Sequence, residues 1–317
     1  MKLVWTLTAG LVLAVVLGLL VMLGYEAEPA PPAPVAPATT TAAAIRIGLI
    51  PERDIFALRK RQQILADYFA GQLGRPVELV TGNSYETVLQ DFAEKRIEAA
   101  ILGSLVTVLC VDRLGARVIA KTELHGGVST YHGVICVPAE SPITSVGQLA
   151  GQSIALVRTT TGGNLFPIHE LLRLGLMNEG QAPRLVWVGT HDDAVDTMMK
   201  GLTTAAAAKD LRVSAWLRDH PGRDIRILAT SGEAPENALV VRGDVADTLG
   251  AELSRIVLNM DKTDAGRAAL RDYGATRFLP CDIADYQVIY DLVADIGDQW
   301  KLLGVAGAPP QPLPGKR

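Results

Sequence analysis

The sequence has little cysteine, few aromatic residues and no long basic run, and each shortage excludes a class of function. The cysteines Cys110, Cys136 and Cys281 are odd in number and widely spaced, so they form no metal-binding pattern and at most one disulfide. Cys110 and Cys136 lie in apolar runs, which favours buried side chains. Aromatic residues make up 5% of the chain and the formal net charge is −4. Both values argue against a nucleic-acid-binding surface.

Patterns of catalytic residues are missing as well. The sequence contains no Ser/His/Asp elbow, no Cys/His pair and no cluster of residues with metal-ligand spacing. Four of the five histidines, His125, His132, His169 and His220, fall in unrelated contexts. We therefore expect a protein that is not an enzyme and that needs neither a metal nor a cofactor.

The N-terminal segment is apolar and long. Residues 3–23 are apolar apart from two threonines, which is long enough to cross a bilayer, and one lysine precedes them. A signal peptide cut after Ala27 would place Tyr25 at position −3, where a small residue is required. We expect residues 1–24 to be an uncleaved membrane anchor, with a removed signal peptide as the alternative.

Residues 25–44 are rich in proline and alanine and predict a stiff, extended linker. Beyond it, strand and helix patterns alternate, which predicts α/β architecture with parallel sheets and helices on both faces. After residue 245 the pattern shows helices without intervening strands, so we expect the C-terminal segment to pack back onto the first lobe. The expected strands are residues 45–50, 77–80, 97–102, 118–121, 134–137, 154–157, 185–188, 205–208, 225–229 and 238–241.

The segment that follows the strand at residues 154–157 is the best candidate for a binding site. It contains Thr159, Thr160 and Thr161, then two glycines, and an amphipathic helix begins directly after them. Glycine allows positive φ and a close approach to a ligand, and the first N–H groups of a helix have no partner inside it. Because these N–H groups lie at the positive end of the helix dipole, the segment predicts a cradle for an oxyanion. The alternative is an ordinary turn and helix cap.

Other polar side chains also follow the carboxyl ends of expected strands, where ligands bind in open α/β sheets. Ser104 follows the third strand, and Thr190 and His191 follow the strand at residues 185–188. His191 could donate a hydrogen bond to an oxyanion, although a lone histidine is more often structural or exposed. The two aspartates after His191 fit a first helical turn, where carboxylates complement the dipole.

Five segments carry, in order, a resemblance to a known family. The series resembles the phosphate/phosphite/phosphonate-binding proteins of ABC importers, which are type II periplasmic binding proteins of the phosphonate-receptor group. The match runs from about residue 45 to about residue 201, with a weaker continuation to residue 260. The segments are IRIGLIP from residue 45, GNSYETVLQDFAEKRIEAAILGS from 82, TYHGVICVPAESPITSVGQLAGQSIALV from 130, TTTGGNLFP from 159 and VGTHDDAVDTMMKG from 188.

The resemblance implies two α/β lobes that are joined by two crossovers and close on the ligand like a hinge. We expect lobe I to begin with residues 45–131, lobe II to comprise residues 132–232, and residues 233–317 to return to lobe I and end in helices.

The resemblance also implies roles for individual residues. Thr159, Thr160 and Thr161 would donate hydroxyl and backbone hydrogen bonds to the oxyanion, and His191 would match the family histidine that does the same. Tyr131 would line the cleft near the first crossover, with a packing role at the hinge as the alternative.

Two departures from the family pattern bear on the ligand. After the histidine helix the family usually has an acidic residue in a strand, whereas Thr203 and Thr204 stand near that place here. The missing carboxylate makes an aminoalkylphosphonate a poorer ligand and a fully ionised oxyanion a better one. The cradle also has Thr-Gly-Gly where the family tends to carry Ser-Thr-Ser-Gly, which removes one donor. Arg158 could supply charge or face solvent.

The leading hypothesis is therefore an extracytoplasmic solute-binding protein, tethered to the cytoplasmic membrane through its N-terminal helix. It would capture a phosphate-, phosphite- or phosphonate-like oxyanion and deliver it to an ABC permease. The alternative is a membrane-anchored sensor of the same fold that signals through a separate partner, such as a kinase or a cyclase. An enzyme is the third class, and no residue pattern favours it.

Overall fold

The computed structural model describes residues 43–50 and 55–313. The expected membrane anchor at residues 1–24 and nearly all of the linker lie outside the described residues. Within the part of the chain that is described, no helix is long and apolar enough to cross a membrane.

The first sheet has six strands in the spatial order β11-β4-β10-β3-β1-β2. The strands are β1 (Ile45–Leu49), β2 (Val77–Thr81), β3 (Ala99–Leu102), β4 (Arg117–Glu123), β10 (Ala238–Val241) and β11 (Arg277–Pro280). β1 pairs in parallel with β2 and β3, whereas β10 and β11 run antiparallel to their neighbours. The helices packed around this sheet are α2 (Ile55–Leu73), α3 (Tyr85–Ala93), α4 (Ser104–Leu114), α8 (Ala251–Val257) and α9 (Asp264–Tyr273).

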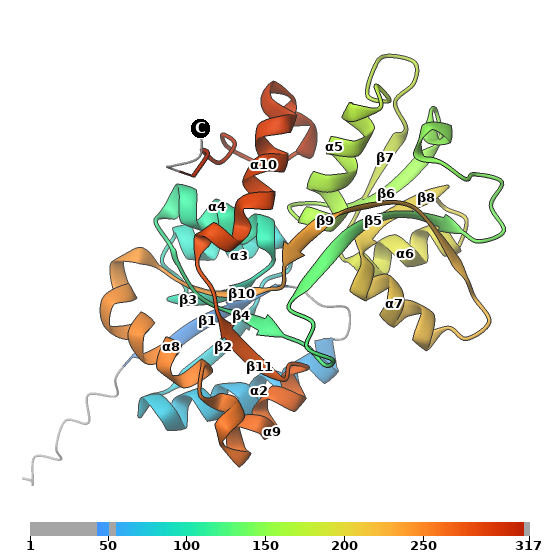
Figure 1. Cartoon of the computed structure of the whole chain (residues 1–317). Helices are drawn as coiled ribbons and strands as arrows, with labels where there is room; N and C mark the ends of the chain where they lie inside the picture. The colour runs from blue at the N-terminus through green and yellow to red at the C-terminus, as the bar shows by residue number, and fades with distance from the viewer. Residues whose placement is uncertain (1–42, 51–54, 314–317) are drawn as a thin grey trace, which may run out of the picture. The chain divides into compact units, whose positions relative to one another are not determined.

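The second sheet has five strands in the spatial order β7-β6-β8-β5-β9. The strands are β5 (Thr130–Pro138), β6 (Ser153–Val157), β7 (Arg184–Val188), β8 (Ala205–Lys209) and β9 (Ile225–Pro235). β6 pairs in parallel with β7 and β8, and β5 runs antiparallel to β8 and β9. The helices α5 (Phe166–Arg173), α6 (His191–Met199) and α7 (Asp210–Asp219) belong to this half (Figure 1).

The chain passes between the two sheets twice, from β4 to β5 and from β9 to β10. The second crossover is short, because only Glu236 and Asn237 separate β9 from β10. All ten expected strands are present, but both sheets are mixed rather than parallel, because the returning strands β5 and β10 run against their neighbours.

Two elements were not expected from the sequence. β11 lies between α9 and α10 (Gln287–Ile296), so the C-terminal part of the chain is not purely helical. Its four residues carry little strand signal of their own, and pairing with β4 supplies the backbone hydrogen bonds. α7 begins directly after β8 and was not identified from the sequence.

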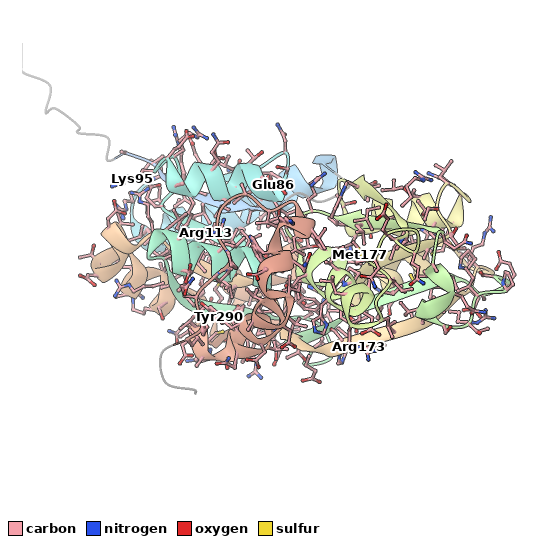
Figure 2. All side chains as sticks on the ribbon, turned by 90° about the horizontal axis from the view of Figure 1, so that it is seen from above. Glu86, Lys95, Arg113, Arg173, Met177 and Tyr290 are labelled. Atoms are coloured by element: carbon pink, nitrogen blue, oxygen red, sulfur yellow. The ribbon has the colours of Figure 1, made fainter. Side chains whose placement is uncertain are left out.

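The C-terminal segment packs against both halves of the fold, and not onto the first lobe alone as expected. α10 contacts α4 of the first half, and α5 and β9 of the second. Figure 2 labels Arg113 of α4 and Tyr290 of α10, the two helices that are in contact. Asn164 Nδ2 donates to Leu303 O at 2.8 Å, and Arg113 donates to Ala306 O at 2.6 Å. The first bond joins the segment after α10 to the second half of the fold, and the second bond joins it to the first half.

Local residues define the starts of two helices in the first half. The Ser84 hydroxyl caps α3 by accepting a hydrogen bond from Thr87 N at 3.1 Å. Gly103 is the N-cap of α4, and because glycine has no side chain, no cap side chain accepts a hydrogen bond from the first N–H groups of this helix. Ser104 is therefore held at the first turn of α4, beyond the end of the fully buried strand β3.

Candidate functional site

A cleft of about 530 Å³ is lined by residues from both halves of the fold. The first half contributes the start of α4, and the second contributes the turn after β6 and the facing ends of α6 and α7. All seven residues that we selected from the sequence line this cleft, namely Ser104, Tyr131, Thr159, Thr160, Thr161, Thr190 and His191. Ser104 and His191, which are 87 positions apart in the sequence, are thus brought together only by the fold, in agreement with the rule that strand ends collect at one edge.

The turn after β6 is held by its own threonines. Thr160 caps the π-helical turn Thr161–Leu165, which continues into α5. The Thr160 hydroxyl donates to Val157 O at 2.8 Å and accepts from Gly163 N at 3.2 Å. The Thr159 hydroxyl donates to the carboxylate of Glu86 in α3. Both hydroxyls are therefore engaged within the protein, and they shape the turn instead of pointing a free donor into the cleft.

The two glycines of the turn have a different role from the one expected. Neither Gly162 nor Gly163 has a positive φ; the left-handed residue is Thr159, with φ of 57°. A β-carbon on Gly162 would lie 3.1 Å from Gly133 Cα and 3.2 Å from Ala208 O. Glycine is needed here because the turn lies directly against the second sheet, and the backbone strain is at Thr159.

Three buried polar atoms of residues that line the cleft have no hydrogen-bond partner. Two of them can act as donors, Thr161 Oγ1 and His191 Nδ1, and the third is the carboxylate oxygen Glu236 Oε2. The Tyr131 hydroxyl is close enough to Thr161 Oγ1 to interact with it, but makes no hydrogen bond of normal geometry with it. A buried polar atom without a partner is destabilising, and few are found in native proteins. The missing partners are therefore best supplied by a ligand.

His191 is placed by the helix cap in front of it. The Thr190 hydroxyl accepts from Asp193 N at 3.1 Å, and Asp193 Oδ2 accepts from Thr190 N at 3.0 Å, which forms a capping box at the start of α6. The Thr190 hydroxyl also donates to Asp193 Oδ2 at 2.8 Å. The hydroxyl of Thr190 is thus used by the helix, although the residue lines the cleft. The cap fixes His191 at the first position of α6, beside Gly163, whose β-carbon would lie 3.1 Å from the ring carbon Cε1.

The surroundings of His191 favour its neutral form. Burial, reinforced by the positive charges of Lys209 and Arg212, lowers the pKa of His191 from 6.5 to about 3. The residue as a whole is half-buried, but its Nδ1 atom has no access to solvent. At neutral pH the imidazole therefore carries one N–H, which can be donated to an oxyanion from Nδ1 in the appropriate tautomer.

This lowered pKa predicts a pH-dependent stability. Between pH 6.5 and about 3 the unfolded chain binds a proton at His191 that the folded protein does not bind, so the free energy of unfolding falls as the pH drops. The expected loss is about 1.4 kcal/mol per pH unit below the ordinary pKa. Denaturant unfolding at pH 7 and pH 5 should show a smaller loss in His191→Gln than in the parent. Equal losses would mean that His191 titrates normally in the folded protein.

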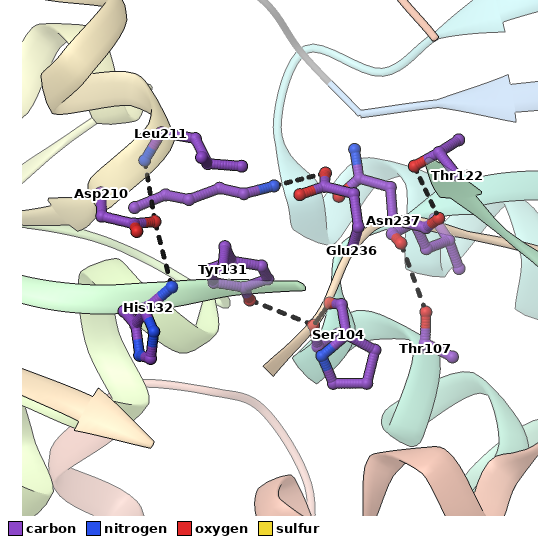
Figure 3. A network of polar contacts seen from close by, with 12 residues as sticks. Ser104, Thr107, Thr122, Tyr131, His132, Asp210, Leu211, Glu236 and Asn237 are labelled. Atoms are coloured by element: carbon purple, nitrogen blue, oxygen red, sulfur yellow. Dashed lines mark hydrogen bonds and ion pairs between the residues drawn. The ribbon is translucent and has the colours of Figure 1, made fainter. Parts of the chain in front are cut away.

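Tyr131 and Ser104 join both crossovers to the start of α4. The Ser104 hydroxyl donates to Pro235 O at 2.6 Å and lies 3.1 Å from the Tyr131 hydroxyl, which therefore donates to Ser104 Oγ (Figure 3). Burial raises the pKa of Tyr131 to about 12. Tyr131 belongs to β5 and Pro235 to β9, so one short chain of hydroxyls links both crossover strands. Tyr131 thus lines the cleft and also packs at the hinge.

The sequence analysis missed an ion pair in the cleft. Lys209, at the end of β8, pairs with Glu236 of the second crossover, and its ammonium lies 4.2 Å from the centre of the Tyr131 ring (Figure 3). Both side chains are buried, at 11% and 3% exposed. The signal that could have found Lys209 is the rule that selected Ser104, since Lys209 directly follows the apolar part of its strand. Glu236 also supplies a carboxylate to the cleft, from a different segment than the family carboxylate near whose place Thr203 and Thr204 stand.

The remaining charges are arranged as follows. Arg212 of α7 pairs with Asp192 of α6, with Nε 3.1 Å from Oδ1. Arg158 is exposed and stacks on the Trp187 ring at 4.3 Å, so it faces away from the cleft.

Among residues 43–50 and 55–313, no group of three or more His, Cys, Asp or Glu is placed to hold a metal ion. The three cysteines are free, and Cys110 and Cys136 are buried as expected.

Comparisons with known proteins agree with this fold. The profile of the family described as "ABC transporter, phosphonate, periplasmic substrate-binding protein" matches residues 47–286. A relative from Prochlorococcus marinus (strain MIT 9301), "Probable ABC transporter phosphite binding protein PhnD1", is 22% identical over 267 residues, which cover 78% of this chain and 88% of that protein.

Two solved structures share the fold. PhnD1 from Prochlorococcus marinus, solved in complex with methylphosphonate, has a TM-score of 0.68 at 20% identity and covers 80% of this chain and 98% of its own. A binding protein component of an ABC phosphonate transporter from Pseudomonas aeruginosa has a TM-score of 0.71 at 16% identity, covering 82% and 94%.

The chain belongs to the family of periplasmic substrate-binding proteins of phosphonate ABC transporters, because the family profile spans most of its length. The type II periplasmic-binding-protein fold, which the sequence motifs predict, is confirmed by these structural matches.

Proposed function

We propose that this protein captures a small phosphorus oxyanion in its cleft and delivers it to the permease of an ABC importer. The observation that carries the proposal is the pair of buried, unpartnered atoms Thr161 Oγ1 and His191 Nδ1. They come from the first turns of two helical segments that follow β6 and β7, and both line the same cleft. An oxyanion between them would accept a hydrogen bond from each, which removes the cost of leaving them unpaired.

The backbone adds donors that a tetrahedral oxyanion can use. The first N–H groups of the helical segment that starts at Thr161 have no acceptor within it, and the dipole of the segment favours negative charge at this end. Thr159, Thr160 and Thr190 contribute by fixing the two turns through the hydrogen bonds described above. Ser104 and Tyr131 also line the cleft.

The named ligands of the relatives support this class of ligand. PhnD1 is described as a phosphite-binding protein, and its solved structure contains methylphosphonate. We therefore place phosphite, phosphate and alkylphosphonates first among the candidate ligands. Delivery to an ABC permease follows the family to which the chain belongs.

A thermal-shift screen tests the proposal. The full chain in mild detergent is heated alone and with phosphate, phosphite, methylphosphonate, sulfate or small carboxylates. A ligand that binds only the folded state, present at about a hundred times its dissociation constant, stabilises that state by about 2.7 kcal/mol. We expect a higher melting temperature with at least one phosphorus oxyanion and none with the carboxylates. A panel in which no phosphorus compound raises the melting temperature would contradict the proposal.

We further propose that residues 1–24 tether the protein to the outer face of the cytoplasmic membrane, with the linker as a spacer. A sensor of the same fold, signalling through a separate membrane partner, would share the ligand-binding step. Deletion of the gene separates the two, because loss of a transport component abolishes uptake of the oxyanion itself. Loss of a sensor would change only the response to it. Resistance of the membrane-bound chain to extraction by alkaline carbonate tests the tether.

A further inference from the structure

We propose that Lys209 is a built-in ammonium group that fills a cation site of the cleft and thereby excludes ligands that carry an ammonium group. The inference rests on the proposed function, and adds to it which phosphonates the cleft accepts. It starts from the buried contacts of Lys209 with Glu236 and with the Tyr131 ring.

The surroundings of the Lys209 ammonium form a complete cation site. A carboxylate oxygen of Glu236 pairs with it from the second crossover, and the face of the Tyr131 ring lies 4.2 Å away on β5. A carboxylate together with an aromatic face is the chemistry that recognises ammonium ions. Tyr131 lies on β5, where its hydroxyl bonds to Ser104, and Glu236 lies in the second crossover. The chain's own lysine therefore occupies the place that a ligand cation would otherwise take.

The second oxygen of Glu236 points to the same conclusion. Glu236 Oε2 is buried and has no hydrogen-bond partner, while the other oxygen is paired with Lys209. A ligand ammonium that approached this oxygen would also approach the Lys209 ammonium. Two like charges in a buried site repel strongly, and one carboxylate cannot neutralise both. The other charged groups near this place are the Arg212–Asp192 pair, which adds no net charge, and Arg218, which lines the cleft and adds a positive charge. Asp210, next to Lys209 in the chain, accepts from the backbone N–H groups of His132 and Leu211, and His191 is neutral.

The expected selectivity is the first test, and it needs no variant. Ethylphosphonate and 2-aminoethylphosphonate have nearly the same shape and differ by a terminal ammonium group. We expect the wild-type protein, titrated calorimetrically, to bind ethylphosphonate at least about tenfold more tightly, a difference of about 1.4 kcal/mol. Equal affinities, or tighter binding of the amino compound, would overturn the inference.

Removal of the lysine should reverse the preference. Lys209→Ala leaves the Glu236 carboxylate and the Tyr131 face open, so we expect the variant to bind 2-aminoethylphosphonate more tightly than ethylphosphonate. The double variant Lys209→Ala/Glu236→Gln lacks the carboxylate and should lose that gain. Lys200→Ala is the matched control, because Lys200 pairs with Asp196 on the surface of the same half and is 65% exposed. A Lys209→Ala protein that keeps the wild-type preference would overturn the inference.

A rescue experiment tests the cation site without any phosphonate. Propylammonium has the size of the group that Lys209→Ala removes, and should raise the melting temperature of this variant but not of the wild type or of the double variant. No rise in Lys209→Ala would overturn the inference even if phosphonates bind. If propylammonium raises the melting temperature of Lys209→Ala but the wild type binds neither phosphonate, the cation site is upheld and the proposed function is contradicted.

Discussion

Replacing Thr161 by valine and His191 by alanine together is expected to weaken the binding of methylphosphonate by about 100-fold or more. Each substitution removes one buried donor from the oxyanion, and the loss of one such hydrogen bond costs about 1–3 kcal/mol. Thr161→Val keeps the shape of the side chain and removes only the hydroxyl that lacks a partner in the free protein. Isothermal titration of the parent, both single variants and the double variant measures the loss directly.

The stability of these variants serves as a check on the interpretation. Because Thr161 Oγ1 and His191 Nδ1 bond to nothing in the free protein, their removal breaks no internal hydrogen bond. His169→Gln is a suitable control, since His169 pairs with Asp295 outside the cleft and should not affect affinity. A double variant that binds methylphosphonate as tightly as the parent would show that the oxyanion lies elsewhere.

Gly133→Ala is expected to destabilise the protein by about 1–3 kcal/mol, the usual cost of forcing an extra carbon into a packed site. The added β-carbon would lie 2.8 Å from Gly162 Cα and 3.0 Å from Phe166 Cδ1. The backbone of the turn must then move away from β5, which also displaces Thr161. We therefore expect weaker oxyanion binding together with a lower free energy of unfolding, measured by denaturant titration.

Gly71→Ala is the matched control for this substitution. Gly71 lies in α2, and a β-carbon there would meet no atom within 4 Å. Alanine is favoured over glycine inside a helix by about 0.5–1 kcal/mol, so this variant should be more stable than the parent. If Gly133→Ala unfolds at the same denaturant concentration as the parent, the contact between Gly133 and Gly162 is not as tight as the structure indicates.

The positions of the strands and of the cleft residues could be predicted from sequence because both depend on local pattern. Apolar strands, followed by small or hydroxyl residues and then by helices, place Ser104, Thr161 and His191 at strand ends, and the α/β architecture brings strand ends together. The roles of individual hydroxyls could not be predicted this way. Thr160 and Thr190 cap helices, as the same pattern also allows, and only the three-dimensional contacts show which hydroxyl stays free.

The features that escaped prediction depend on contacts between distant segments. Lys209 and Glu236 are 27 residues apart and meet only because β8 and the second crossover converge at the hinge. The need for glycine at position 162 comes from Gly133 and Ala208, on two other strands. No local pattern encodes such approaches, since each requires the register of the whole second sheet. β11 was missed for the same reason, because its pairing with β4 determines its conformation.

A crystal structure of the protein grown with methylphosphonate tests the central claim most directly. The account predicts that phosphonate oxygens lie in the cleft within about 2.7–3.2 Å of Thr161 Oγ1 and His191 Nδ1, the range of normal hydrogen bonds. Lys209 should remain paired with Glu236 in that complex, as it is in the free protein. A phosphonate bound at another place, with Thr161 Oγ1 and His191 Nδ1 still without partners, would contradict the account.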